Sequence, residues 1–103
     1  MSTAERLAAD LAQVGFEQAE AAARGDWDAV TRHDQTRRTL LEAMRAITPT
    51  DSPEVRASLA SAQVAARQVE QAFRIARPAL TAEMRRQSVG AAAGRAYGSA
   101  GSN

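Results

Sequence analysis

Residues 22–30 read AARGDWDAV, and this short stretch decides how the first half of the chain folds. Gly25 can adopt the left-handed conformation that ends a helix, and Arg24 favours the negative end of the helix dipole. Asp26 follows at once as an N-cap, with Asp28 in the first turn of the next helix. Because almost no residues are left for a loop, the two helices are predicted to fold back as an antiparallel αα-hairpin.

The two helices of this hairpin are predicted over about residues 3–24 and 27–47. Ser2 followed by Glu5 matches a capping box, which marks the start of the first helix. The residue before Pro49 resists helical geometry, so the second helix is expected to end there.

Apolar side chains recur at helical spacing in both segments, as expected for helices that share a core. The first helix carries Leu7, Leu11 and Val14 in one row, which Ala21 continues after the polar Gln18. On or beside one stripe of the second helix lie Trp27, Val30, Arg37, Leu40, Leu41, Met44 and Ile47.

A third helix is predicted to start at residues 52–54, read as an N-cap serine, a proline at the first helical position and an acid in the first turn. Its apolar residues step by three and four like the seam of a coiled coil. The row consists of Val55, Leu59, Ala62, Ala66, Val69, Phe73, Ala76, Leu80 and Met84.

Pro78 interrupts this row without shifting its phase, at a cost of about 3 kcal/mol inside a helix. We therefore expect one helix over 53–77 and a weaker one over 78–89, joined by a kink or a break, and a flexible Gly/Ala/Ser tail over 90–103. The predicted fold class is all-α: an antiparallel hairpin plus a long third helix, forming one elongated three- to four-helix bundle domain over 1–89.

Composition supports this fold class and excludes others. The chain of 103 residues contains 25 alanines, no cysteine and few aromatic or β-branched residues, which excludes an all-β fold. The N-terminal residues lack the apolar core of a secretory signal, and no apolar run is long enough for a membrane span. A cytoplasmic protein without a membrane span is expected.

The charges are nearly balanced overall but unevenly distributed. The formal net charge is +1, which weighs against a nucleic-acid partner. Residues 1–52 carry a balance of −3 and residues 53–103 a balance of +4. This asymmetry favours the basic helix lying beside the acidic one, or beside an acidic partner.

Catalysis is difficult to build from these residues, so the chain is predicted not to be an enzyme, and no cofactor or metal is expected. There is no cysteine nucleophile, and the single histidine, His33, has no partners at metal-ligand spacing. Glu17 and Glu20 are expected to form a solvated face. Val64 and Ile75 lie outside the apolar row, either packing against a neighbouring segment or lining a groove for an amphipathic partner helix.

The junction at residues 25–28, GDWD, is followed by Arg37 ten residues after Trp27 and then by a leucine-rich turn within residues 37–44, RRTLLEAM. This combination resembles the FliT family of flagellar export chaperones. The residues that carry the motif, which we interpret as structural, are Gly25, Asp26, Trp27, Arg37, Leu40, Leu41 and Met44.

The resemblance implies a cytoplasmic, non-enzymatic chaperone of flagellar type III export. Such a protein holds the filament-cap protein and delivers it to the export ATPase complex, and some members also restrain the flagellar master regulator. Tyr97 corresponds in position to a C-terminal tyrosine of the family. We hypothesise that the partner is bound by Val69, Phe73, Ile75, Leu80, Met84 and Tyr97.

Two other interpretations remain open. The ending over residues 94–98, GRAYG, is similar to the tails of FlgN chaperones, which serve the hook–filament junction proteins. Alternatively, the row over 55–84 forms a homodimer, and the chain is a self-associating coiled-coil or regulatory protein without an export client.

Overall fold

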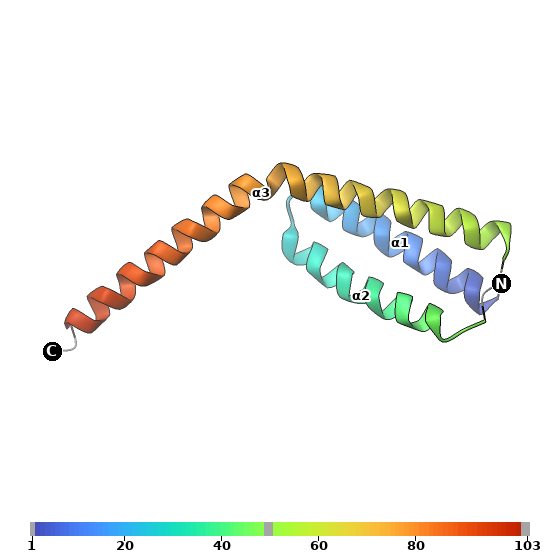
Figure 1. The fold of residues 1–103 in the computed structure, drawn as a ribbon, viewed down its shortest axis with the longest axis horizontal. Helices are drawn as coiled ribbons and strands as arrows, with labels where there is room; N and C mark the ends of the chain where they lie inside the picture. Colours follow the sequence, from blue (N-terminus) through green and yellow to red (C-terminus); the bar gives the residue numbers. More distant parts are fainter. Residues whose placement is uncertain (1, 49–50, 102–103) are drawn as a thin grey trace. The chain divides into compact units, whose positions relative to one another are not determined.

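The computed structural model describes the backbone of residues 2–48 and 51–101 and the side chains of 2–48 and 51–90. These residues form three helices and no strand: α1 (Thr3–Ala23), α2 (Trp27–Arg45) and α3 (Pro53–Gly101), shown in Figure 1. The predicted all-α fold class is confirmed. The chain divides into two compact units, which we call the bundle unit (Met1–Phe73) and the C-terminal unit (Arg74–Asn103).

The joint between α1 and α2 forms as its sequence predicts. Gly25 is left-handed, with φ of 72°, and its N–H donates to the carbonyl of Ala22 at 3.0 Å. The N–H of Asp26 donates to the carbonyl of Ala21 at 2.9 Å. These two bonds make a Schellman motif, which satisfies carbonyls at the end of α1. The Asp26 carboxylate then accepts from the N–H of Ala29 at 3.1 Å and caps α2.

The other two helices also begin at their predicted caps. The N–H of Glu5 donates to Ser2 Oγ at 3.1 Å, and the N–H of Val55 donates to Ser52 Oγ at 3.1 Å. Helix α2 ends at Arg45, two residues before the predicted boundary. An N-cap hydrogen bond involves only residues three positions apart, so the sequence predicts where a helix starts. The end of α2 has no such side-chain cap, and its predicted boundary was less accurate.

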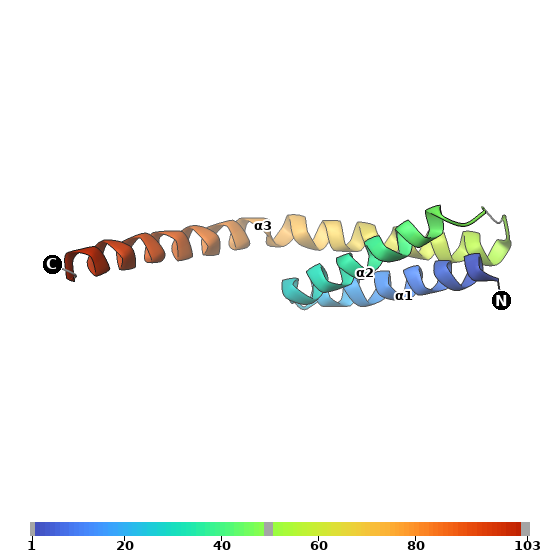
Figure 2. The ribbon, with the colours of Figure 1, turned by 90° about the horizontal axis from the view of Figure 1, so that it is seen from below.

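Within the bundle unit, α1, α2 and the first part of α3 lie side by side and run in alternating directions, as Figures 1 and 2 both show. One part of the core combines Ala4, Ala8 and Val55 with the half-buried Met44, Ile47 and Leu59. Farther along, α1 buries Leu11 and α2 buries Ala29. The core is therefore built mostly from small side chains.

The row that α1 buries differs from the predicted one. Leu7 and Val14 are only half-buried, and the buried residues of α1 are Ala4, Ala8, Leu11, Gly15, Gln18, Ala21 and Ala22. The prediction followed the bulkiest side chains, but helices that approach closely place small residues at their contact and larger ones at its flanks.

The contact between α1 and α3 is closest at Gly15. A Cβ atom placed on Gly15 would lie 3.2 Å from the Cβ of Ala65 and 3.8 Å from the backbone of Ala62. Ala65 itself is buried. Glycine at this point of α1 therefore sets how near the two helix axes can come.

Gln18, expected only as a polar gap in an apolar row, is 5% exposed and lies between α1 and α2. Its Nε2 donates to the carbonyl of Val30 at 3.1 Å. A buried amide needs such a partner, because leaving it unsatisfied costs about 1–3 kcal/mol. This bond therefore ties α1 to α2 close to the joint between them.

The boundaries predicted for the third helix were wrong. A single helix, α3, runs from Pro53 to Gly101 with Pro78 inside it, instead of two helices over 53–77 and 78–89. The residues expected as a tail are helical as far as Gly101, and residues 102–103 lie outside the described part. Residues 91–101 contain five alanines, the best helix formers, and three glycines that cost about 1 kcal/mol each relative to alanine, yet the helix continues through them.

Candidate partner-binding site

The single histidine, His33, lies beside Glu17 in the bundle unit. His33 Nδ1 lies 3.8 Å from Glu17 Oε2, which joins α2 to α1, and Gln13 donates to the other oxygen of the same carboxylate at 3.1 Å. Glu17 is therefore a helix–helix contact and not simply a solvated side chain. Among the side chains described, those of residues 2–48 and 51–90, no three metal-binding groups come together.

Trp27 occupies the start of α2, where its ring meets Phe73 of α3 edge to face. The ring centroids are 5.8 Å apart and the planes are inclined by 82°. Arg37 lies 3.6 Å from Asp34, one turn earlier on α2, and Asp34 also pairs with Arg38 at 2.9 Å. These contacts lie within the bundle unit.

The leucine-rich turn of the motif also belongs to the bundle. Leu40 and Leu41 are half-buried, and Met44 packs against the core.

The six residues predicted to bind a partner fall into two groups. Val69 is half-buried and Phe73 is 47% exposed, both within the bundle unit. In the C-terminal unit, Leu80 is half-buried, whereas Ile75 and Met84 are 74% and 70% exposed. The side chain of Tyr97 lies outside the described residues.

The apolar row expected as a dimer seam is partly used inside the chain. Val55 is buried, and Leu59, Ala62, Ala66 and Val69 are half-buried in the bundle unit. That part of the row helps to build the core. Of its later members, Ala76 and Leu80 are half-buried, whereas Phe73 and Met84 are exposed.

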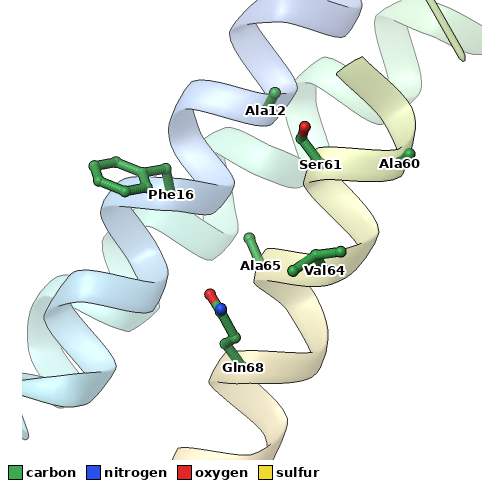
Figure 3. Close-up of a pocket in the computed structure, with 7 residues that line it drawn as sticks. All are labelled: Ala12, Phe16, Ala60, Ser61, Val64, Ala65 and Gln68. Carbon is green, nitrogen blue, oxygen red and sulfur yellow. The ribbon is translucent and has the colours of Figure 1, made fainter. Parts of the chain in front are cut away.

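A shallow hollow of about 430 Å³ opens between α1 and α3 in the bundle unit (Figure 3). We call it the α1–α3 hollow. Its lining is uncharged and consists of Ala12, Phe16, Ala60, Ser61, Val64, Ala65 and Gln68. In Figure 3, Ser61, Ala65 and Gln68 point from α3 towards α1, whereas the ring of Phe16 extends from α1 on the side away from α3. Phe16 is 58% exposed and Val64 is 46% exposed.

The hollow follows from the small residues that surround it. Gly15 brings α1 close to Ala65, and Ala12 and Ala60 leave the space beside this contact unfilled. Phe16 comes directly after Gly15, so it points outward from the same turn of the helix. Phe16 and Val64 are therefore large, partly exposed apolar side chains beside an uncharged hollow.

Sequence reasoning named Val64 as a candidate groove residue but missed Phe16. The sequence did hold one indication of Phe16: it lies off the apolar row predicted for the first helix, where an aromatic side chain is not expected to enter the core.

No helix in the described part of the chain has the length and apolar character needed to cross a membrane. Comparison of the chain with family models, curated proteins and solved structures finds no match.

Proposed function

We propose that this chain is a binding protein that holds an amphipathic helix of a partner in the α1–α3 hollow. One observation carries the proposal: Phe16 and Val64 remain 58% and 46% exposed beside an uncharged, alanine-lined hollow. Helix-in-groove recognition uses such a surface and reads apolar anchors at positions i, i+3, i+4 and i+7 of the partner.

The size of the surface suits reversible binding. Covering a large apolar side chain contributes about 1.5–3 kcal/mol, so two such side chains provide useful affinity without creating an obligate interface. The alanines along both helices allow a partner backbone to come close. A partner helix would lie along α1 and α3 as an additional member of the bundle.

More specifically, we propose a cytoplasmic flagellar export chaperone whose client is the filament-cap protein. One support is the resemblance carried by residues 22–44. The other is that a chaperone has to cover an apolar segment of its client, and the α1–α3 hollow offers partly exposed apolar side chains and an uncharged lining. Delivery to the export ATPase complex and restraint of the master regulator belong to the same proposal. A FlgN-like chaperone for hook–filament junction proteins is the alternative client assignment.

The test is a calorimetric titration of the full-length chain with the filament-cap protein, and separately with the hook–filament junction proteins. Saturable binding to the cap protein is expected, weakened about tenfold by Phe16→Ser because each 1.4 kcal/mol is a factor of ten. Val89→Ser is the matched control, since Val89 is 70% exposed but lies in the C-terminal unit.

Each outcome of this titration decides between the assignments. Binding of the junction proteins alone would move the client assignment to the FlgN-like alternative. Failure of all these proteins to bind would contradict the export-chaperone proposal. Equal losses in the two variants would contradict the assignment of binding to the α1–α3 hollow.

A further inference from the structure

We propose that the C-terminal unit pairs with an acidic amphipathic helix of a partner protein through one face of α3. We call it the Ile75–Val89 face; it consists of Ile75, Ala79, Ala82, Arg86 and Val89. This proposal concerns a different unit from the α1–α3 hollow and does not depend on the identity of the client held there.

The C-terminal unit carries large apolar side chains that its own structure does not cover. Ile75, Met84 and Val89 are 74%, 70% and 70% exposed. Within this unit the described residues belong to a single helix. One helix has no second element on which to bury an apolar face, so most of its stability in a protein comes from packing against something else.

The spacing of the Ile75–Val89 face is that of a helix pair. Its five members follow one another at intervals of four, three, four and three residues, the repeat that keeps one seam facing a partner helix. Leu80 and Met84 belong to a different stripe, since Leu80 lies about 140° around the helix from Ile75. The two stripes therefore cannot both contact one flat surface.

This division of the apolar residues favours a helix over a membrane. A helix that lies on a membrane gathers its apolar residues on one face, whereas here Ile75 and Val89 are separated from Leu80 and Met84. A partner helix needs only the narrow seam.

The charge of the unit specifies the chemistry of the partner. Residues 74–103 contain five arginines and one acid, for a net charge of +4, whereas residues 1–73 have a net charge of −3. Arg86 lies within the seam, and its side chain pairs with Glu83 of the same helix, where both are exposed. A carboxylate on a partner helix, placed opposite Arg86, would meet this cation across the interface.

The same charges disfavour pairing of the Ile75–Val89 face with the same face of a second copy of this chain. Parallel pairing in register would place Arg86 opposite Arg86, and the two helices would each bring a charge of +4. Like charges at a seam select against self-pairing and in favour of a complementary partner.

The experiment uses the full-length chain and a synthetic helical probe three heptads long. The probe carries leucine at its seam positions, glutamate beside them and one glutamate in the seam position that faces Arg86. A second peptide has glutamine in place of every glutamate. Binding is measured by fluorescence anisotropy of the labelled peptide, and Trp27 emission reports that the bundle unit remains folded.

We expect saturable binding of the acidic peptide, and binding weaker by about tenfold or more for the glutamine peptide. Arg86→Glu should weaken binding of the acidic peptide by a similar factor. A peptide with lysine in the facing seam position should recover affinity for the Arg86→Glu variant. Ile75→Ser combined with Val89→Ser should weaken both peptides, whereas Phe16→Ser should change neither.

Three results would overturn the proposal. One is equal affinity for the acidic and glutamine peptides. The second is no recovery in the charge exchange. The third is tighter binding to phosphatidylglycerol vesicles or to a DNA duplex than to the acidic peptide, which would assign the basic helix to a membrane or a nucleic acid. None of these results bears on client binding at Phe16.

Discussion

The ring of Trp27, the first residue of α2, meets the ring of Phe73 edge to face, with centroids 5.8 Å apart and planes inclined by 82°. This contact joins the start of the second hairpin helix to the third helix. Phe73 was predicted as a partner-binding residue, yet its ring already has an aromatic neighbour. Its role in the bundle and a role in binding can be separated by substitution.

Phe73→Ala should lower the free energy of unfolding of the bundle unit by about 1–2 kcal/mol, because it removes an aromatic pair and some apolar burial. Phe16→Ala is the matched control. Phe16 is 58% exposed and has no aromatic ring beside it among the residues whose side chains are described. Urea denaturation followed by Trp27 fluorescence measures both variants, and equal losses would show that the ring pair contributes nothing.

The close approach of α1 and α3 at Gly15 makes a second prediction. Gly15→Leu should destabilise the bundle unit by about 1–3 kcal/mol, because the added side chain has to displace Ala65 and open the contact between the helices. Gly90→Leu is the control, since a Cβ at Gly90 meets nothing within 4 Å. Thermal unfolding by circular dichroism compares the two, and an unchanged midpoint for Gly15→Leu would mean that the helices are not tightly packed there.

The buried amide of Gln18 gives a third prediction. Gln18→Ala removes the hydrogen bond to the carbonyl of Val30 and leaves a gap between α1 and α2, at an expected cost of about 1–2 kcal/mol. Gln13→Ala, in which an exposed residue of the same helix is replaced, should change stability by less than about 0.5 kcal/mol. Chemical denaturation of both variants measures this difference, and equal unfolding free energies for Gln18→Ala and Gln13→Ala would show that the buried hydrogen bond does not stabilise the hairpin.

The turn between α1 and α2 supplies a fourth prediction. At the φ of 72° found for Gly25, a side chain with a Cβ is strained, so Gly25→Ala should cost about 1–2 kcal/mol. Gly25→Asn should cost less, because asparagine tolerates the left-handed region better than alanine does. Equal unfolding free energies for glycine and alanine would contradict a role for the Schellman motif in stabilising the hairpin.

The parts of the fold that depend on local chemistry were predictable from the sequence. Ser2, Asp26 and Ser52 cap their helices through hydrogen bonds to residues three positions later, and Gly25 ends α1 as expected. Such patterns involve only neighbouring residues, so they can be read without knowing how the helices pack.

Features that depend on packing were harder to predict. The α1 prediction chose Leu7 and Val14 for the core, whereas the structure buries Gly15 and Gln18. The distance between two helix axes decides whether small or large residues face the interface. The spacing of apolar residues along a single helix does not reveal that distance. Phe16 was missed for the same reason. The hollow beside it forms only where α1 packs against α3, so the sequence of α1 alone does not show it.

Pro78 lies inside a helix without ending it. Its cost inside a helix predicted a kink or a break; α3 is not broken there and runs through it to Gly101, so of the two alternatives only the break is wrong. Proline removes one backbone hydrogen bond, whereas the residues on both sides are good helix formers that keep their own bonds. A single proline therefore did not mark a helix boundary here.

The central claim, that the α1–α3 hollow receives a helix of the filament-cap protein, is tested most directly by nuclear magnetic resonance of the isotope-labelled full-length chain titrated with that protein. We predict that the amide resonances of residues 12–16 and 60–68 shift or broaden on binding, and that Phe16→Ser abolishes these changes while Val89→Ser preserves them. Binding that leaves these two segments unperturbed, or no binding at all, would contradict the claim.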